Sequence, residues 1–161
     1  MLQHNIPPIF NKNSKILILG SFPSVKSRET QFFYGHPQNR FWRVLAALFY
    51  CPAPSTLEGK KAILLDNGIA LWDVIASCDI TGSGDASIKN VVPNDLRRIT
   101  EAADIGNIFT NGGTSDRYYK KFCFQQTGIH AIKLPSTSPA NAGCSLEKLV
   151  RAWESVRESL K

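Results

Sequence analysis

The stretch KILILGSFPS, residues 15–24, decides the fold. Its first six residues place four aliphatic side chains in a row and end in glycine at Gly20. Such a run is too short for a helix and apolar towards both faces, which is typical of a strand buried in a parallel sheet. The sequence therefore predicts a strand over residues 15–20, followed by a long polar loop.

Further apolar runs repeat this pattern along the chain. They predict strands at residues 69–77 (IALWDVIAS), 105–110 (IGNIFT) and 129–134 (IHAIKL). Helical patterns lie between these runs, so the strands are too far apart for hairpins and their connections must cross over the sheet. We predict an α/β fold, a three-layer α/β/α arrangement with a central four-stranded, mostly parallel sheet.

Short polar residues in front of periodic apolar segments predict where the helices begin. We expect one helix to begin near Gln38 or Asn39, directly after Pro37, and another to cover residues 116–128. The other expected N-caps are Ser55 (with Glu58 three residues later), Asn94 and Ser145.

Length and charge narrow the class of protein. The 161 residues suit one domain with its own core, which we expect over residues 1–161 with a loosely ordered segment at 1–14. A net charge of +6 and a sequence pI of about 9.3 favour a polyanionic partner such as nucleic acid. No apolar run is long enough for a transmembrane helix or a secretion signal, so we expect an intracellular protein that binds no membrane.

Motifs of several enzyme classes are missing from the sequence. The turn after the first strand lacks the lysine of a P-loop, and there is no G-x-S-x-G elbow of a serine hydrolase. The GSGD segment at residues 82–85 is too short for a dinucleotide fingerprint and predicts a turn. The four cysteines form no close pair and the three histidines lie in unrelated contexts. We expect neither a metal nor a cofactor.

Polar loops follow all four predicted strands. They cover residues 21–38, 78–90, 111–115 and 135–143. Ligands of parallel sheets bind beyond the carboxyl ends of the strands. We therefore expect these loops to meet along one edge of the molecule, which would be its active face.

The segment FFYGHPQNRFW, residues 32–42, combines flat rings with hydrogen-bonding groups. Phe41 and Trp42 fall on a helical stripe and are expected in the core. Phe33 and Tyr34 lie in the loop, where a ring could stack on a planar heterocycle such as a nucleobase, and Asn39 could reach a sugar or a water.

With three other motifs, this segment resembles the uracil-DNA glycosylase superfamily, within it the branch of hypoxanthine (deoxyinosine) DNA glycosylases, close to the mismatch-specific enzymes. The motifs are ILGSFPS at 18–24, HPQNRFW at 36–42, GIALWDVI at 68–75 and LPSTSPANA at 134–142. The resemblance covers nearly the whole chain. It implies a monofunctional enzyme that flips a deaminated base out of DNA and hydrolyses its N-glycosidic bond.

The resemblance also implies which residue is catalytic. In the better-known branches an Asp or Asn in the turn after the first strand activates the attacking water, whereas this turn offers only Ser21 and Ser24. In the hypoxanthine branch that this chain resembles, the Asn of the HPxNRFW motif is tied to catalysis, which implies this role for Asn39. We expect Asn39 to orient a water through its carbonyl oxygen and to act by positioning, because an amide is a poor base.

Further residues are expected around the flipped base and along the DNA. Phe33 is expected to stack on the base, with Tyr34 as the alternative. The pocket wall is expected from Ser21, Phe22, Trp72 and Asp73, although Asp73 could equally cap a backbone turn. The expected DNA-binding residues are Ser24, His36, Asn111, Ser136, Thr137, Ser138, Ala140 and Asn141, the last five in a loop that by resemblance presses into the DNA.

Several alternatives stay open at this point. The preferred base could be hypoxanthine, uracil or xanthine. A non-catalytic DNA-binding relative is a second hypothesis, and a hydrolase of free nucleosides is a third, which the basic charge disfavours. The sequence does not determine the oligomeric state. We expect DNA that contains deaminated bases as the partner, and a monomeric protein.

Overall fold

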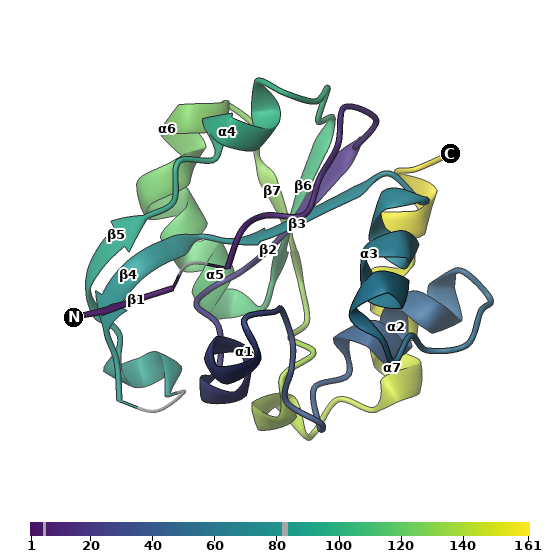
Figure 1. The fold of residues 1–161 in the computed structure, drawn as a ribbon, viewed down its shortest axis with the longest axis horizontal. Coiled ribbons are helices and arrows are strands. Elements are labelled where there is room, and N and C mark those ends of the chain that lie inside the picture. The colour runs from purple at the N-terminus through teal and green to yellow at the C-terminus, as the bar shows by residue number, and fades with distance from the viewer. Residues whose placement is uncertain (5, 82–83) are drawn as a thin grey trace.

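The computed structural model describes residues 1–4, 6–81 and 84–161, and within them the strands form two sheets (Figure 1). The main sheet is parallel throughout, in the order β3 (Ile69–Asp73), β2 (Ile16–Gly20), β6 (Asn107–Asn111) and β7 (Ala131–Leu134). The predicted four-stranded parallel sheet is therefore confirmed. The KILILG strand pairs on both sides and is fully buried, which explains why it is apolar towards both faces.

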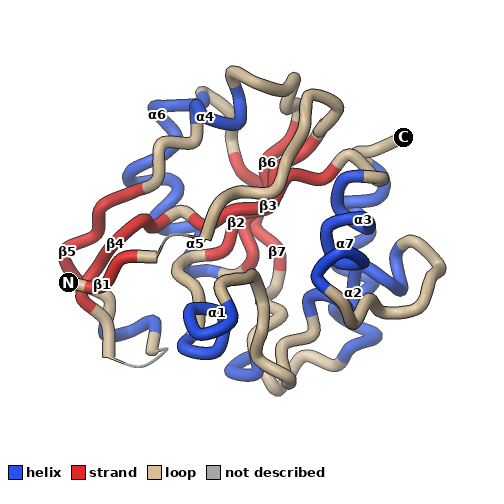
Figure 2. Tube along the Cα trace, viewed as in Figure 1, coloured by secondary structure: helices blue, strands red, loops and turns tan. Residues whose placement is uncertain are grey.

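Helices cover both faces of this sheet, as predicted (Figures 1 and 2). One side carries α2 (Phe41–Leu48), α3 (Leu57–Leu65) and α7 (Leu146–Glu158). The other carries α4 (Arg97–Thr100), α5 (Gly113–Tyr118) and α6 (Phe124–Thr127). The rings of Phe41 on α2 and Trp153 on α7 meet edge to face at 5.8 Å, and both residues are fully buried. The described residues contain no helix that is long and apolar enough to cross a membrane.

A second, antiparallel sheet was not predicted. Residues 69–77, expected as one strand, form two, because β3 ends at Asp73 and β4 (Ile75–Asp79) leaves the main sheet. β4 pairs with β1 (Leu2–Gln3) and β5 (Lys89–Pro93). The expected loop at 78–90 thus shrinks to the β4–β5 connection, which contains the short helix η1 (Asp85–Ser87). Gly82 and Ser83 of the predicted GSGD turn lie outside the described residues.

Helix starts agree with the predictions at α7 and differ elsewhere. Ser145 caps α7 by accepting from the N–H of Lys148, as expected. α2 begins slightly later than expected, at Phe41. Thr56, in place of Ser55, caps α3 by accepting a hydrogen bond from a backbone N–H. Both residues are good N-caps, and the sequence alone does not decide between neighbours.

Two further helical segments differ from the predictions. Asn94 is not an N-cap, because its amide nitrogen donates to the carbonyl of Asp73 at 2.8 Å. The helix expected over residues 116–128 is broken into α5, the π-helical turn η2 (Tyr119–Cys123) and α6. For Asn94, the side-chain amide is engaged in a tertiary hydrogen bond with Asp73. Helix propensity carries no information about such a contact.

Candidate active site

A cavity of about 300 Å³ opens at the carboxyl ends of the main strands. Residues of the loops at 21–38, 111–115 and 135–143 line it, and the expected loop at 78–90 contributes Asp85. These segments gather in the lower part of Figure 1, around α1 (Val25–Thr30). The prediction that the loops meet along one edge is confirmed. The volume lies at the lower limit of ligand pockets, so it suits a single base better than a whole nucleotide.

Most of the predicted site residues line this cavity. They are Ser21, Phe22, Ser24, Phe33, Tyr34, His36, Asn39, Asp73, Asn111, Ser136, Thr137, Ser138 and Ala140. Trp72 and Asn141 do not. Asn141 lines a neighbouring depression, together with Lys133 and Thr114.

Trp72 is not part of the cavity wall, which corrects the prediction. Its indole N–H donates to the carbonyl of Ile6 at 3.3 Å, and the guanidinium of Arg98 lies 5.7 Å from its ring centre. Successive side chains of a strand point to opposite faces of a sheet. Since Asp73 faces the cavity, the preceding Trp72 must face away from it.

Asn39 is held in place by hydrogen bonds from two directions. Its side-chain oxygen Oδ1 accepts from the backbone N–H of Phe41 at 3.0 Å and from the hydroxyl of Thr137 at 2.8 Å. The Thr137 hydroxyl accepts in turn from Nδ2 of Asn111 at 3.0 Å. One chain of hydrogen bonds thus joins the loops that follow β2, β6 and β7.

This network changes the expected role of the Asn39 atoms. A backbone N–H can only donate, so the atom facing Phe41 must be the carbonyl oxygen and not the amide nitrogen. Both acceptor positions of that oxygen are occupied within the protein. The sequence predicted that this carbonyl oxygen orients a water, but the oxygen is not free to do so. The amide NH₂ is the group that remains for a ligand in the cavity.

Thr137 is fully buried, and its hydroxyl holds Asn39 in place. Its backbone N–H also donates to Oδ1 of Asn111 at 3.0 Å. Thr137 lines the cavity as well, so its predicted contact with DNA stays a prediction, and its positioning of Asn39 is a role that the sequence did not indicate. Asn111 shares in the same positioning network and also lines the cavity.

The loop at 135–143 is shaped by its own polar side chains. The Ser136 hydroxyl accepts from the N–H of Ser138, and the Ser138 hydroxyl accepts from the N–H of Ala140. The guanidinium of Arg40 donates to the carbonyls of Asn141, at 3.0 Å, and Cys144. These hydroxyls and the Asn141 amide therefore stabilise the loop, which leaves exposed Ala140 and backbone groups to meet a ligand.

Asp73 and Tyr34 meet over Gly20. Gly20 pairs with Asp73 in the register of β2 and β3, and the Asp73 carboxyl folds over the space that a side chain would fill. A Cβ on Gly20 would lie 2.5 Å from Oδ1 of Asp73 and 3.0 Å from the Tyr34 hydroxyl. Tyr34 itself has a backbone φ of 52°, a left-handed conformation that is uncommon for a bulky residue.

The electrostatics of Asp73 set it apart from a surface carboxylate. It is 4% exposed, and its Oδ2 has no hydrogen-bond partner among the described residues. Burial raises the pKa of Asp73 to about 7. Burial and the nearby Asp73 also raise the pKa of the Tyr34 phenol, which an interaction with the Asn111 side chain opposes. Near neutral pH the Asp73 carboxyl is therefore available as a hydrogen-bond donor as well as an acceptor.

Three aromatic rings contribute to the cavity. Tyr34 stacks on Phe41 with ring centres 4.1 Å apart, so one of its faces is already covered. Phe33 meets Phe32 edge to face at 5.6 Å and is 2% exposed. Phe22 also lines the cavity and is 8% exposed.

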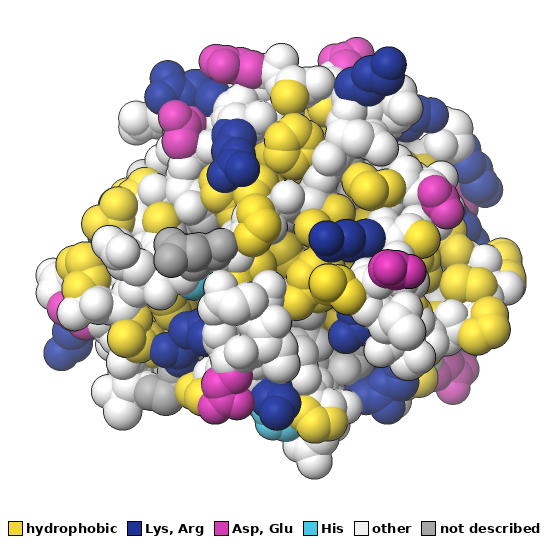
Figure 3. Space-filling model, in the orientation of Figure 1, with side chains coloured by type: hydrophobic (Ala, Val, Ile, Leu, Met, Phe, Trp, Pro, Cys, Tyr) yellow, Lys and Arg dark blue, Asp and Glu magenta, His cyan; other side chains and the backbone are white. Residues whose placement is uncertain are grey.

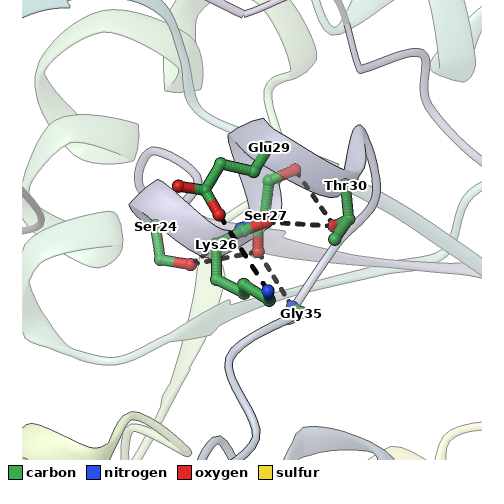
Figure 4. A network of polar contacts seen from close by, with 6 residues as sticks. All are labelled: Ser24, Lys26, Ser27, Glu29, Thr30 and Gly35. Atoms are coloured by element: carbon green, nitrogen blue, oxygen red, sulfur yellow. Dashed lines mark hydrogen bonds and ion pairs between the residues drawn. The ribbon is translucent and has the colours of Figure 1, made fainter.

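The loop after β2 is fixed by Ser27, a residue that the sequence did not single out (Figure 4). Its hydroxyl accepts from the N–H of Gly35 at 2.9 Å and from the Ser24 hydroxyl at 3.1 Å. Ser24 in turn caps α1 by accepting from the N–H of Ser27. This helix lies inside the predicted polar loop, and it returns the chain towards Phe33 and Tyr34 at the cavity.

The surface charge does not form a single basic patch on the face shown in Figure 3, where Lys and Arg side chains are scattered among acidic ones. On this face the excess of basic residues behind the net charge of +6 is not gathered in one place. A distributed charge still favours approach to a polyanion, but it does not locate the binding face. The cavity and its loops do that.

A sequence model described as the uracil DNA glycosylase superfamily matches residues 7–157 of the chain. This span contains all the cavity-lining residues described above. The chain belongs to the uracil DNA glycosylase superfamily. The resemblance noted from the four motifs is therefore confirmed over nearly the full length.

Individual relatives within this superfamily are similar over their whole length. The "Hypoxanthine DNA glycosylase" of Methanosarcina acetivorans is 32% identical, with 97% of this chain and 98% of the relative covered. The protein of the same name from Methanosarcina barkeri is also 32% identical, with 95% and 96% covered. A solution NMR structure from Methanosarcina acetivorans, described as a candidate uracil DNA glycosylase, matches with a TM-score of 0.84 and 32% identity over 99% of both chains.

Proposed function

We propose that this superfamily member is a monofunctional DNA glycosylase that removes hypoxanthine from deoxyinosine in DNA and leaves an abasic site. The observation that carries the proposal is the cavity, which has room for one flipped base and presents an amide, a buried carboxyl group and aromatic rings together. The two full-length relatives named hypoxanthine DNA glycosylase support the choice of base. One chain builds the whole cavity, so we propose that a monomer acts on DNA.

Asp73 is assigned to the departing base. As the glycosidic bond breaks, negative charge moves onto the base, and hypoxanthine can carry it on its C6 oxygen. A neutral Asp73 carboxyl donates its proton in a hydrogen bond to that oxygen, and the bond strengthens as the charge grows. Adenine has no C6 oxygen, so the undamaged base gains no such stabilisation. Uracil and xanthine also carry ring carbonyls and are therefore the competing substrates.

Asn39 is assigned to the attacking water. Because Oδ1 is held by Phe41 and Thr137, Asn39 presents its NH₂ group, which donates to the oxygen of the water and fixes it near the sugar. An amide cannot take up the proton of that water, which is released to solvent while the departed base anion takes up a proton from solvent. We therefore propose that the enzyme gains rate by positioning and by stabilising the leaving base, and not by strong general-base catalysis.

The remaining roles are assigned from the positions of the residues around the cavity. Phe33 stacks on the flipped base, Ser21 and Phe22 complete its surroundings, and Ser24 and His36 lie at the DNA side of the loop after β2. The loop at 135–143 contacts the strand from which the base is taken. The partner is DNA that contains deaminated bases.

The substrate is tested with synthetic duplexes that carry hypoxanthine, uracil or xanthine at one position. Single-turnover excision is measured as alkali-labile abasic sites. We expect hypoxanthine to be released fastest and an adenine control to stay intact. Release of uracil with hypoxanthine left untouched would show that the substrate assignment is wrong.

Replacement of Gly20 by alanine tests whether the meeting of Asp73 and Tyr34 matters. The new methyl group would collide with Oδ1 of Asp73, so that carboxyl must move away from the base. We expect excision to fall about tenfold or more, since overpacking of this kind costs about 1–3 kcal/mol and each 1.4 kcal/mol is tenfold in rate.

The matched control is Gly106→Ala, where a Cβ would meet only the carbonyl of Lys15, at an ordinary 3.9 Å. It should leave excision within about twofold, because it changes a glycine without touching the cavity. Equal losses in both variants would mean that Gly20 has no special place in the site.

A further inference from the structure

A residue from the start of the chain lies behind the cavity wall. The His4 side chain is 1% exposed, and its Nε2 lies 3.9 Å from Oδ2 of Asp73. Its ring meets the cavity-lining ring of Phe22 edge to face at 5.3 Å. No sequence motif points to this position, because His4 directly follows the two-residue strand β1 and belongs to none of the four motifs.

Hydrogen bonds to β4 hold His4 in this place. The backbone N–H of His4 donates to the carbonyl of Ala76 at 3.2 Å, and Nε2 donates to the carbonyl of Ile75 at 2.8 Å. Nε2 must carry a proton to make that bond, and Nδ1 has no hydrogen-bond partner among the described residues. Burial lowers the pKa of His4, more than the Ile75 bond raises it, so the ring is neutral at neutral pH.

A neutral His4 lies beside the Asp73 carboxyl but offers it no free hydrogen-bond donor. The ring nitrogen nearest to Asp73 already donates to Ile75, and 3.9 Å is too long for a hydrogen bond. An ionised carboxylate on this side would be buried without compensation, which favours the neutral carboxyl. The imidazole lies against this side of the carboxyl, and both side chains are almost fully buried, at 1% and 5% exposed.

The other ionisable groups around the pair act as follows. The Tyr34 phenol faces Asp73 from the loop after β2, and Asp85 faces the same cavity from the β4–β5 connection. The charge of Arg28 on α1 adds to the lowering of the His4 pKa by burial, whereas burial raises the pKa of the Cys78 thiol of β4 in spite of Arg28. No member of this set donates to Oδ2 of Asp73, which has no hydrogen-bond partner in the part of the chain that the structure describes.

We propose that His4 is a positioning residue: its ring seals the cavity behind Asp73, excludes water, and keeps the Asp73 carboxyl in the neutral form that donates to the departing base. This role of His4 rests on the proposed function of Asp73. The N-terminal segment, expected to be loosely ordered, would then complete the active site.

The test is the pH dependence of hypoxanthine excision in the full-length protein. In the wild type the rate should fall as the pH rises through about 7, where Asp73 ionises. His4→Ala admits water to the carboxylate and should move this decline to lower pH by about one unit or more. At pH 7.5 the variant should then be about five- to tenfold slower, and at pH 5.5 nearly equal.

Two variants separate this role from simple loosening of the N-terminus. Gln3→Ala changes the exposed residue of β1 that directly precedes His4, and it should leave the pH profile unchanged. His4→Gln fills most of the space and can still donate to Ile75, so it should restore most of the wild-type profile. An unshifted profile in His4→Ala, or an equal shift in Gln3→Ala, would overturn the proposal.

A measurement without DNA keeps this result apart from the substrate assignment. Carbon-13 NMR of the labelled Asp73 carboxyl reports its titration directly. In the wild type we expect a midpoint near the pKa of about 7 to which burial raises Asp73, and in His4→Ala we expect a lower midpoint. A shift in this midpoint supports the role of His4 even if hypoxanthine is not the substrate, and equal midpoints reject it.

Discussion

Asn39→Ala is expected to lower the single-turnover rate of hypoxanthine excision by about 100-fold or more, with little change in duplex binding. The substitution removes the NH₂ group that we assign to the attacking water. It also removes the acceptor that holds the Thr137 hydroxyl and the Phe41 N–H. Excision and fluorescence-detected duplex binding, measured side by side, check the expectation.

Asn39→Asp separates the two ends of the amide. The carboxylate keeps an oxygen for Phe41 and Thr137 but loses the NH₂ donor. If the donor matters, this variant should be nearly as slow as alanine, although a carboxylate is the better base. A variant as fast as the wild type, or faster, would contradict the assignment and return the carbonyl to the role predicted from the sequence.

Thr137→Val is the matched control for positioning. It keeps the shape of a fully buried side chain but removes the hydroxyl that donates to Asn39. Asn39 is then held by Phe41 alone, so we expect a smaller loss, about tenfold. A variant that equals Asn39→Ala would indicate that the network, and not the Asn39 donor, carries the effect.

Asp73→Asn is expected to abolish the pH dependence of excision above neutrality. An asparagine keeps a donor and an acceptor of the same shape but cannot ionise. The wild type should lose up to about tenfold in rate per pH unit above its pKa, whereas Asp73→Asn should stay level. Rates between pH 5.5 and 8.5 check this, and Asp73→Ala, which offers no donor, should be slow throughout.

The same substitution is expected to stabilise the protein at neutral and higher pH. Burial raises the pKa of Asp73 from 3.8 to about 7, so the folded state favours the neutral form. The stability contributed by the neutral form is fully present below the unfolded pKa and is lost as the pH rises from about 4 to about 7. At about 1.4 kcal/mol per pKa unit, Asp73→Asn should gain up to about 4 kcal/mol over that range.

Urea unfolding of both proteins at pH 4 and pH 8 measures this difference. The gap in the free energy of unfolding should be small at pH 4 and large at pH 8. A constant gap would mean that Asp73 is ionised and well solvated in the folded protein, which would also remove its role as a donor to the base.

Much of the fold could be predicted from short stretches of sequence. KILILG is buried on both faces in β2, and the spacing of the four apolar runs required crossover helices, so the order of the elements and their parallel sense followed. The antiparallel sheet escaped prediction for a physical reason. The run at 69–77 remains apolar while its partner changes from β2 to β1 and β5, and an apolar run does not specify its partner.

The sequence predicted which residues form the candidate site better than it predicted what each of them does. Polar loop residues after parallel strands were expected to meet, and most of them line the cavity. Their roles depend on directions that the sequence does not contain. Trp72 and Asp73 are neighbours on opposite faces, and Thr137 looks like a surface hydroxyl but is fully buried against Asn39.

The sequence by itself determined the α/β architecture, the edge of the sheet where the polar loops gather around the cavity, and the superfamily, because strand and helix periods and local motifs are properties of contiguous residues. The tertiary structure alone decided which end of the Asn39 amide is free, that Asp73 is buried over Gly20, and that His4 lies behind it. Each of these depends on a contact between residues far apart in the chain, and such contacts set burial, hydrogen bonding and charge.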